Sequence, residues 1–178
     1  MVFAYYKRLS AANKRIYAES DRIERVALPD PARLHPLIPE LEAALLADDR
    51  LRVQEACRRL AAGMVEQLAI RPVELKVLAV RPSNDYGELH GLYEGVEGRV
   101  KTAKISLWMR TAQKKRAVAF RSFLRTFLHE ICHHLDYEHF RLADSFHTEG
   151  FYKRESSLFY QLVPDAKPLR AARPKPAK

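Results

Sequence analysis

The sequence predicts an α+β protein in which a small three-stranded sheet packs against one long amphipathic helix. The first observation is the alternation of residues 73–80, which are rich in branched side chains, as in a half-buried strand. The second observation is that residues 88–96 and 104–109 have the same character, which predicts two more strands. The third observation is a helical stripe between residues 115 and 137, where apolar side chains recur at spacings of three and four: Phe120, Leu124, Phe127, Ile131 and Leu135.

A helical segment is expected before the sheet. We expect helices over residues 3–25, 41–46 and 50–69. Four prolines between residues 29 and 39 separate the first helix from the second, because proline interrupts a helix interior. Arg71 and Pro72 mark the end of the third helix.

The expected domain organisation has three parts. Residues 1–71 form the N-terminal helical segment, and residues 72–163 form the domain with the sheet and the long helix. A chain of 178 residues is long enough to bury one hydrophobic core. Residues 164–178 are rich in proline, lysine and arginine, which predicts a disordered tail.

The sequence indicates a cytoplasmic protein without a membrane segment. Its start lacks the apolar run of roughly 7 to 15 residues that a signal peptide contains. No stretch approaches the ~20 apolar residues of a membrane span. Cys57 and Cys132 form no spacing motif, which favours a reducing compartment without disulfides.

Residues 129 to 133 read His-Glu-Ile-Cys-His, the H-E-x-x-H pattern of zinc peptidases. On a helix, His129 and His133 lie one turn apart on one face, so both imidazoles can bind one metal. Glu130 lies about 100° round the helix, beside the open metal position. There it can take a proton from a zinc-bound water and pass it to the leaving amine. The motif therefore predicts Zn²⁺, with Glu130 as the catalytic base.

A catalytic zinc needs a third protein ligand, and three residues are candidates. His139 extends the motif to H-E-x-x-H-x-x-D-x-x-H, which resembles the metzincin pattern, but Asp136 replaces its glycine and no methionine follows. Glu155, on an expected second helix, gives the gluzincin arrangement. His147 begins an H-x-x-x-F-aromatic stretch and is the third candidate.

Together, H-E-x-x-H and the H-x-x-x-F beginning at His147 resemble the SprT-like and WLM (YgjP-like) zinc peptidases. The resemblance covers roughly residues 72–162 and implies a minimal zincin-like fold, with a short antiparallel three-stranded sheet leading into the active-site helix. It implies that His147 opens the next helix and that Phe151 anchors it, so His147 is favoured as the third ligand, before Glu155 and then His139. An edge strand would pair with extended substrate. We expect residues 105–110 to be that edge strand, with an ordinary core strand as the alternative.

Asp136 is a candidate for orienting a ligand. It follows His133 by three residues on the same helix face, so its carboxylate could accept the other imidazole proton and fix the tautomer. The alternative is a polar residue near the helix C-terminus without that role.

The charge distribution suggests a polyanionic partner. The net charge is +9, and residues 99–129 contain nine lysines or arginines and no acid. The basic tail adds to this charge. Such segments attract nucleic acid in a salt-dependent way, although a basic solvated face is the simpler interpretation. The SprT-like resemblance implies action on DNA-associated proteins, whereas the YgjP-like one does not.

The sequence therefore favours a zinc metallopeptidase with a protein or peptide substrate. The alternative is a non-proteolytic zinc-binding regulatory or DNA-binding protein on a zincin fold.

Overall fold

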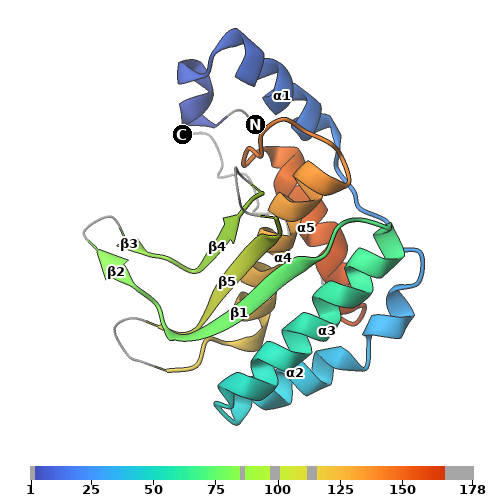
Figure 1. Cartoon of the computed structure of the whole chain (residues 1–178), viewed down its shortest axis with the longest axis vertical. Helices are drawn as coiled ribbons and strands as arrows, with labels where there is room; N and C mark the ends of the chain where they lie inside the picture. The colour runs from blue at the N-terminus through green and yellow to red at the C-terminus, as the bar shows by residue number, and fades with distance from the viewer. Residues whose placement is uncertain (1–2, 85–86, 97–100, 112–115, 167–178) are drawn as a thin grey trace, which may run out of the picture.

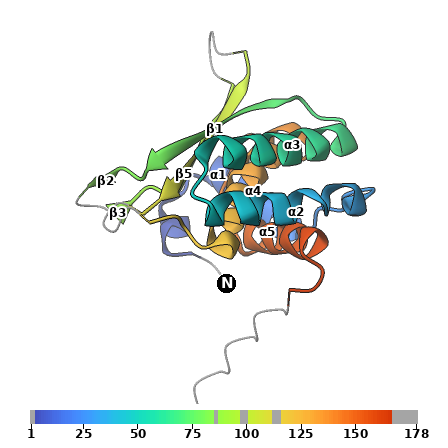
Figure 2. The ribbon, with the colours of Figure 1, turned by 90° about the horizontal axis from the view of Figure 1, so that it is seen from below.

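The α+β class is confirmed by the computed structural model, which describes residues 3–84, 87–96, 101–111 and 116–166. Figures 1 and 2 show the main helices gathered on one side of the sheet. In chain order the elements are η1 (Ala4–Arg8), α1 (Ala11–Arg22), η2 (Pro31–Leu34), α2 (Leu37–Leu46), α3 (Arg50–Leu68), β1 (Val73–Val80), β2 (Ser83–Asn84), β3 (Gly87–Glu88), β4 (Gly91–Glu94), β5 (Ala103–Arg110), α4 (Phe120–Glu138) and α5 (Glu149–Leu162).

The N-terminal helices differ from the expected ranges at their caps. The first helix is divided because Ser10 caps α1, its hydroxyl accepting the Asn13 N–H at 3.1 Å after an extended Leu9. The second begins at Leu37, since Pro39 falls in the first turn, where proline is tolerated. Asp49 caps the third helix, α3.

The sheet is mixed, so the expected all-antiparallel arrangement is wrong. Its order is β1-β5-β4, with β1 parallel to β5 and β4 antiparallel to it. Residues 105–110 were expected at the edge, but they lie in the central strand. Strand β5 is buried along almost its whole length, which only a central position provides. The edge strand nearest α4 is β4 instead.

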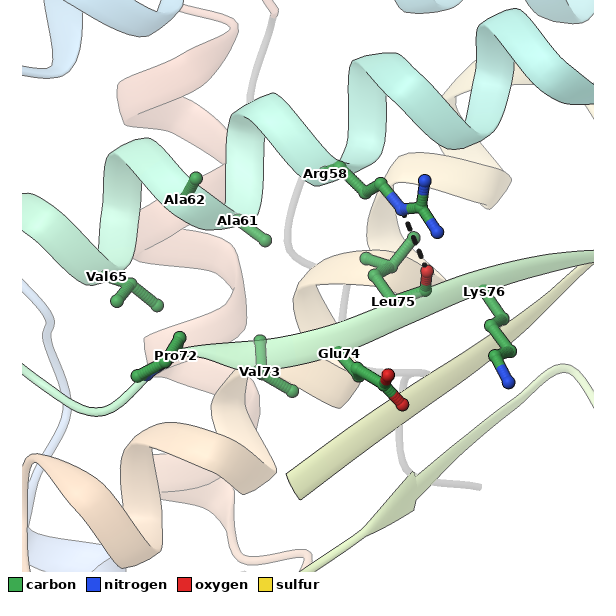
Figure 3. A pocket seen from close by; sticks show the side chains of 9 residues that line it. All are labelled: Arg58, Ala61, Ala62, Val65, Pro72, Val73, Glu74, Leu75 and Lys76. Atoms are coloured by element: carbon green, nitrogen blue, oxygen red, sulfur yellow. Dashed lines mark hydrogen bonds between the residues drawn. The ribbon is translucent and has the colours of Figure 1, made fainter. Parts of the chain in front are cut away.

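The two edges of the sheet differ in accessibility. Helix α3 covers the β1 edge: Arg50 donates to the Val77 carbonyl at 3.0 Å, and Gln54 accepts the Val77 N–H at 3.0 Å. Figure 3 shows Arg58 reaching the Leu75 carbonyl in the same way, at 3.3 Å. These side chains occupy the positions that another strand would need. Strand β4 has no further strand beyond it in the described part of the chain.

The core lies between the sheet and α4. Leu75 and Val77 of β1 are buried beside Ile105 and Leu107 of β5, and they join the same cluster as the helical stripe. Four predicted stripe residues are fully buried, which confirms their interpretation: Leu124, Phe127, Ile131 and Leu135.

Helix α4 begins at Phe120, later than expected. The Val118 N–H still donates to the Met109 carbonyl at 2.8 Å, so the chain stays extended beside β5 until then. Side chains of α2 and α3 also belong to the core cluster, which joins the N-terminal helices to the rest. None of the described helices combines the length and apolar character needed to cross a bilayer. Of the expected tail, residues 167–178 lie outside the described residues.

Candidate metal centre

Three histidines converge at the surface of α4. His129 and His133 lie one turn apart on that helix, and His147 lies just before α5, whose N-cap is Thr148. The His147 Nε2 atom is 2.9 Å from His129 Nε2 and 3.1 Å from His133 Nε2. Ligand nitrogens around a tetrahedral zinc are roughly 3.3 Å apart, given Zn–N distances near 2.05 Å. The three side chains could hold a metal ion between them.

The His133 tautomer follows from its outer hydrogen bond. Ser145 donates its hydroxyl proton to Asp136 at 2.7 Å, so its oxygen can only accept from His133 Nδ1, also 2.7 Å away. The Nδ1 proton leaves the Nε2 lone pair facing the other two imidazoles. Burial lowers the pKa of His133 to about 3, so this ring is neutral at physiological pH.

His129 has the same orientation for a different reason. Its Nδ1 lies 3.4 Å from the Glu155 carboxylate, which accepts but cannot donate when ionised. Its Nε2 therefore also presents a lone pair. His147 Nε2 can donate at most one proton, so the three imidazoles cannot satisfy all of these lone pairs among themselves. A metal bound by three neutral imidazoles satisfies all of them, and the donor set fits zinc.

The other proposed ligands lie outside this group. Glu155 is on the outer side of His129, where Arg125 also donates to it at 3.0 Å, so its carboxylate lies against the outer nitrogen of the imidazole and not beside the three Nε2 atoms. His139 is at the C-terminus of α4 and packs on Phe140, with ring centroids 4.8 Å apart. The structure brings neither side chain to the position between the three Nε2 atoms.

Asp136 acts on His133 through Ser145, not directly as expected. Its second oxygen accepts from Arg154 at 2.8 Å, and both side chains are fully buried. Burial raises the pKa of Asp136 to about 6, while the Arg154 charge opposes the rise. The carboxylate is thus ionised at neutral pH and can hold the Ser145 hydroxyl.

The ring of Phe151 packs against all three imidazoles. Its ring centroid lies 4.9 Å from that of His129, 4.8 Å from His133 and 5.2 Å from His147. The fully buried Phe151 thus keeps the three rings together on an apolar surface.

Glu130 lies between α4 and the free edge strand. It is 6% exposed, and the Tyr93 N–H of β4 donates to its carboxylate. Burial raises the pKa of Glu130 to about 7, against the lowering effects of His129 and the Tyr93 N–H. A carboxyl with such a pKa can accept and release a proton near neutrality.

A groove follows β4 on both sides of the histidines. The central cavity of about 290 Å³ contains Glu130 and Tyr137 together with the three imidazoles. A cavity of about 400 Å³ adjoins it at Gly91, and another of about 590 Å³ adjoins it at Tyr93 and Tyr137. The three cavities therefore extend along β4 to both sides of the three imidazoles. The cavity in Figure 3, about 260 Å³ between α3 and β1, shares none of these residues.

Sequence reasoning missed several residues of the site. Ser145 and Arg154 have no motif of their own, and their roles depend on the fold. Gly91 offered a weak signal, because glycine within a strand often marks a close approach. The structure places it directly against Glu130.

The basic segment is less available than its charge suggests. Three of its bases form ion pairs: Lys104 with Glu94, Arg110 with Asp48, and Arg125 with Glu155. Within residues 99–129, positions 99–100 and 112–115 lie outside the described residues.

Comparison of the chain with protein-family models, with curated proteins and with solved structures gives no match.

Proposed function

We propose that the protein is a zinc metallopeptidase of the H-E-x-x-H type, on a zincin-like fold related to SprT-like and YgjP-like peptidases. The observation that carries this proposal is the convergence of three imidazole Nε2 atoms beside the buried Glu130. His129, His133 and His147 would hold the zinc. When bound, zinc supplies a Lewis acid that polarises a carbonyl and lowers the pKa of water.

Glu130 is the proton carrier in this proposal. Its carboxylate takes a proton from the attacking water and then delivers it to the nitrogen of the leaving amine. Burial holds its pKa near the pH at which both transfers are feasible. The Tyr93 N–H and the adjacent Gly91 keep the carboxylate at one place beside the histidines.

The substrate is proposed to be an extended polypeptide segment. Strand β4 has no further strand beyond it in the described part of the chain, so its main-chain groups other than the Tyr93 N–H, which donates to Glu130, can pair with a substrate strand. Such pairing holds the scissile carbonyl in register with the site and reduces the entropic cost of reaction. The groove on both sides supports cleavage within a chain.

The decisive experiment compares metal content and hydrolysis in wild type and Glu130→Gln. We expect stoichiometric zinc in both proteins, and at least a hundredfold slower cleavage of an unfolded protein substrate by the variant. His133→Ala should lose the metal. A fully active Glu130→Gln would refute the mechanism. Zinc binding without any cleavage would favour the alternative, a non-proteolytic zinc-binding protein.

Nucleic-acid association and a cytoplasmic location remain proposals from the sequence. The two free, buried cysteines fit a reducing compartment. Action on DNA-associated proteins would require contacts to DNA from the lysines and arginines that are not engaged in the ion pairs described above. Binding of a short duplex at two salt concentrations tests this, because phosphate contacts make affinity fall steeply with salt.

A further inference from the structure

The first part of the N-terminal helices, residues 3–22, packs against the turn that carries the third histidine. We call residues 3–22 the N-terminal segment. Residues 3–22 form η1 and α1, and in Figure 1 this segment lies beside the turn that leads into α5. We call residues 146–150 the ligand turn, since it contains His147. More than a hundred residues of sequence separate the two parts.

Three polar contacts reach the ligand turn from this segment. Tyr5 donates its hydroxyl proton to the His147 carbonyl at 2.8 Å. Asp21 accepts the Gly150 N–H at 3.0 Å, and the Ser20 hydroxyl lies 3.4 Å from that of Thr148. The contacts thus hold the turn at His147 itself and at two positions that follow it.

Aromatic side chains add a packed layer to these contacts. Tyr17 is 2% exposed, and its ring lies 6.1 Å from Tyr5 and 6.2 Å from Phe146, measured between centroids. Phe3 meets Tyr152 at 5.9 Å, and Tyr152 in turn stacks on His147 at 6.0 Å. The segment therefore limits both the main chain and the imidazole at position 147.

The backbones approach too closely at Gly150 for any side chain. A Cβ there would lie 2.4 Å from the Asp21 carbonyl oxygen and 2.7 Å from that of Ser20. Arg154 reinforces the contact, because it donates to the Ser20 and Ile23 carbonyls at 2.6 Å each. The fit is between main chains, which have few ways to adjust.

We propose that the N-terminal segment is part of the metal centre, where it fixes His147, with Tyr5 as a positioning residue. His129 and His133 lie on a helix that the core holds rigid, whereas His147 lies on a turn. Without the segment, metal binding would have to order that turn, which opposes binding entropically. The inference rests on the metal centre of the proposed function.

Zinc affinity of the full-length chain tests the proposal, measured by competition with a chromophoric chelator. Tyr5→Phe removes only the hydroxyl, and we expect its zinc Kd to rise about two- to tenfold, the range of one hydrogen bond. Tyr6→Phe is the matched control, because Tyr6 packs on Tyr17 in the same segment without reaching the ligand turn. Its zinc Kd should equal that of wild type.

Asp21 offers a second test, in which a conservative variant should restore the zinc affinity that alanine loses. Asp21→Ala removes the acceptor of the Gly150 N–H and should weaken zinc binding, whereas Asp21→Asn keeps an acceptor oxygen and should restore it. A structural role alone would lower the thermal midpoint of the metal-free protein and leave the zinc Kd unchanged.

The outcomes separate this inference from the proposed function. If wild type binds zinc and Tyr5→Phe and Asp21→Ala bind it equally well, the inference is wrong and the metal centre stands. If wild type binds no zinc, both fail.

Discussion

Gly91 of β4 lies directly against Glu130 of α4, so that a Cβ at position 91 would come 2.4 Å from Oε1 of the carboxylate. The edge strand and the proposed base thus occupy one tightly packed unit. The absence of a side chain at Gly91 is what allows the carboxylate to lie beside the histidines.

Gly91→Ala should therefore impair proton transfer without affecting the metal. The added methyl displaces Glu130, and a shift of about 1 Å in a reacting group can cost on the order of a hundredfold in rate. We expect unchanged zinc content and a lower kcat for peptide hydrolysis. Gly95→Ala is the control, because its nearest contact, Tyr93, would be at an ordinary 3.6 Å. Equal kcat values in the two variants would contradict the assignment.

Ser145→Ala should weaken zinc binding through His133. The variant loses the acceptor that fixes the Nδ1 proton, and loss of such an outer partner typically costs 10- to 100-fold in metal affinity. Ser145→Thr keeps the hydroxyl and should recover most of it. The measurement is the zinc Kd, and a wild-type value in Ser145→Ala would show that the bridge does not orient the imidazole.

Removing one partner of the buried Asp136–Arg154 pair should strongly destabilise the fold. Both side chains are fully buried, and an unpaired charge left there typically costs about 3–5 kcal/mol. We expect Arg154→Met to lower the free energy of unfolding by roughly that amount, measured by urea denaturation of metal-free protein. The double variant with Asp136→Asn should be less destabilised than the sum of the single variants.

The Arg71–Glu138 pair should make stability depend on pH. The hydrogen bond from Arg71 lowers the pKa of Glu138 below its usual 4.5. An acid with a depressed folded-state pKa contributes stability above the unfolded pKa and loses it as pH falls through the folded value. Wild type should thus be more stable than Arg71→Met at pH 7, and the difference should shrink below about pH 4.5. A difference that stays constant down to pH 3 would contradict the pairing.

Much of α4 could be predicted because its information is local. The stripe of Leu124, Phe127 and Ile131 determines which face is buried, and the i, i+4 spacing then places His129 and His133 together on another. The class of the fold followed from the same periodicities. The sheet order did not, because strand alternation states which face is buried but not which strand is the neighbour. In the structure β5 is the central strand, although its residues were expected at the edge, and β4 is an edge strand.

The sequence by itself determined that His129, Glu130 and His133 lie on one helix, since their arrangement depends on spacings within a few turns. It also favoured His147 among three candidates. Only the tertiary structure decided that Glu155 and Ser145 occupy the outer nitrogens, that Gly91 admits Glu130, and that Tyr5 reaches the ligand turn. These are contacts between segments far apart in the chain, and their partners are selected by the packing of the whole core.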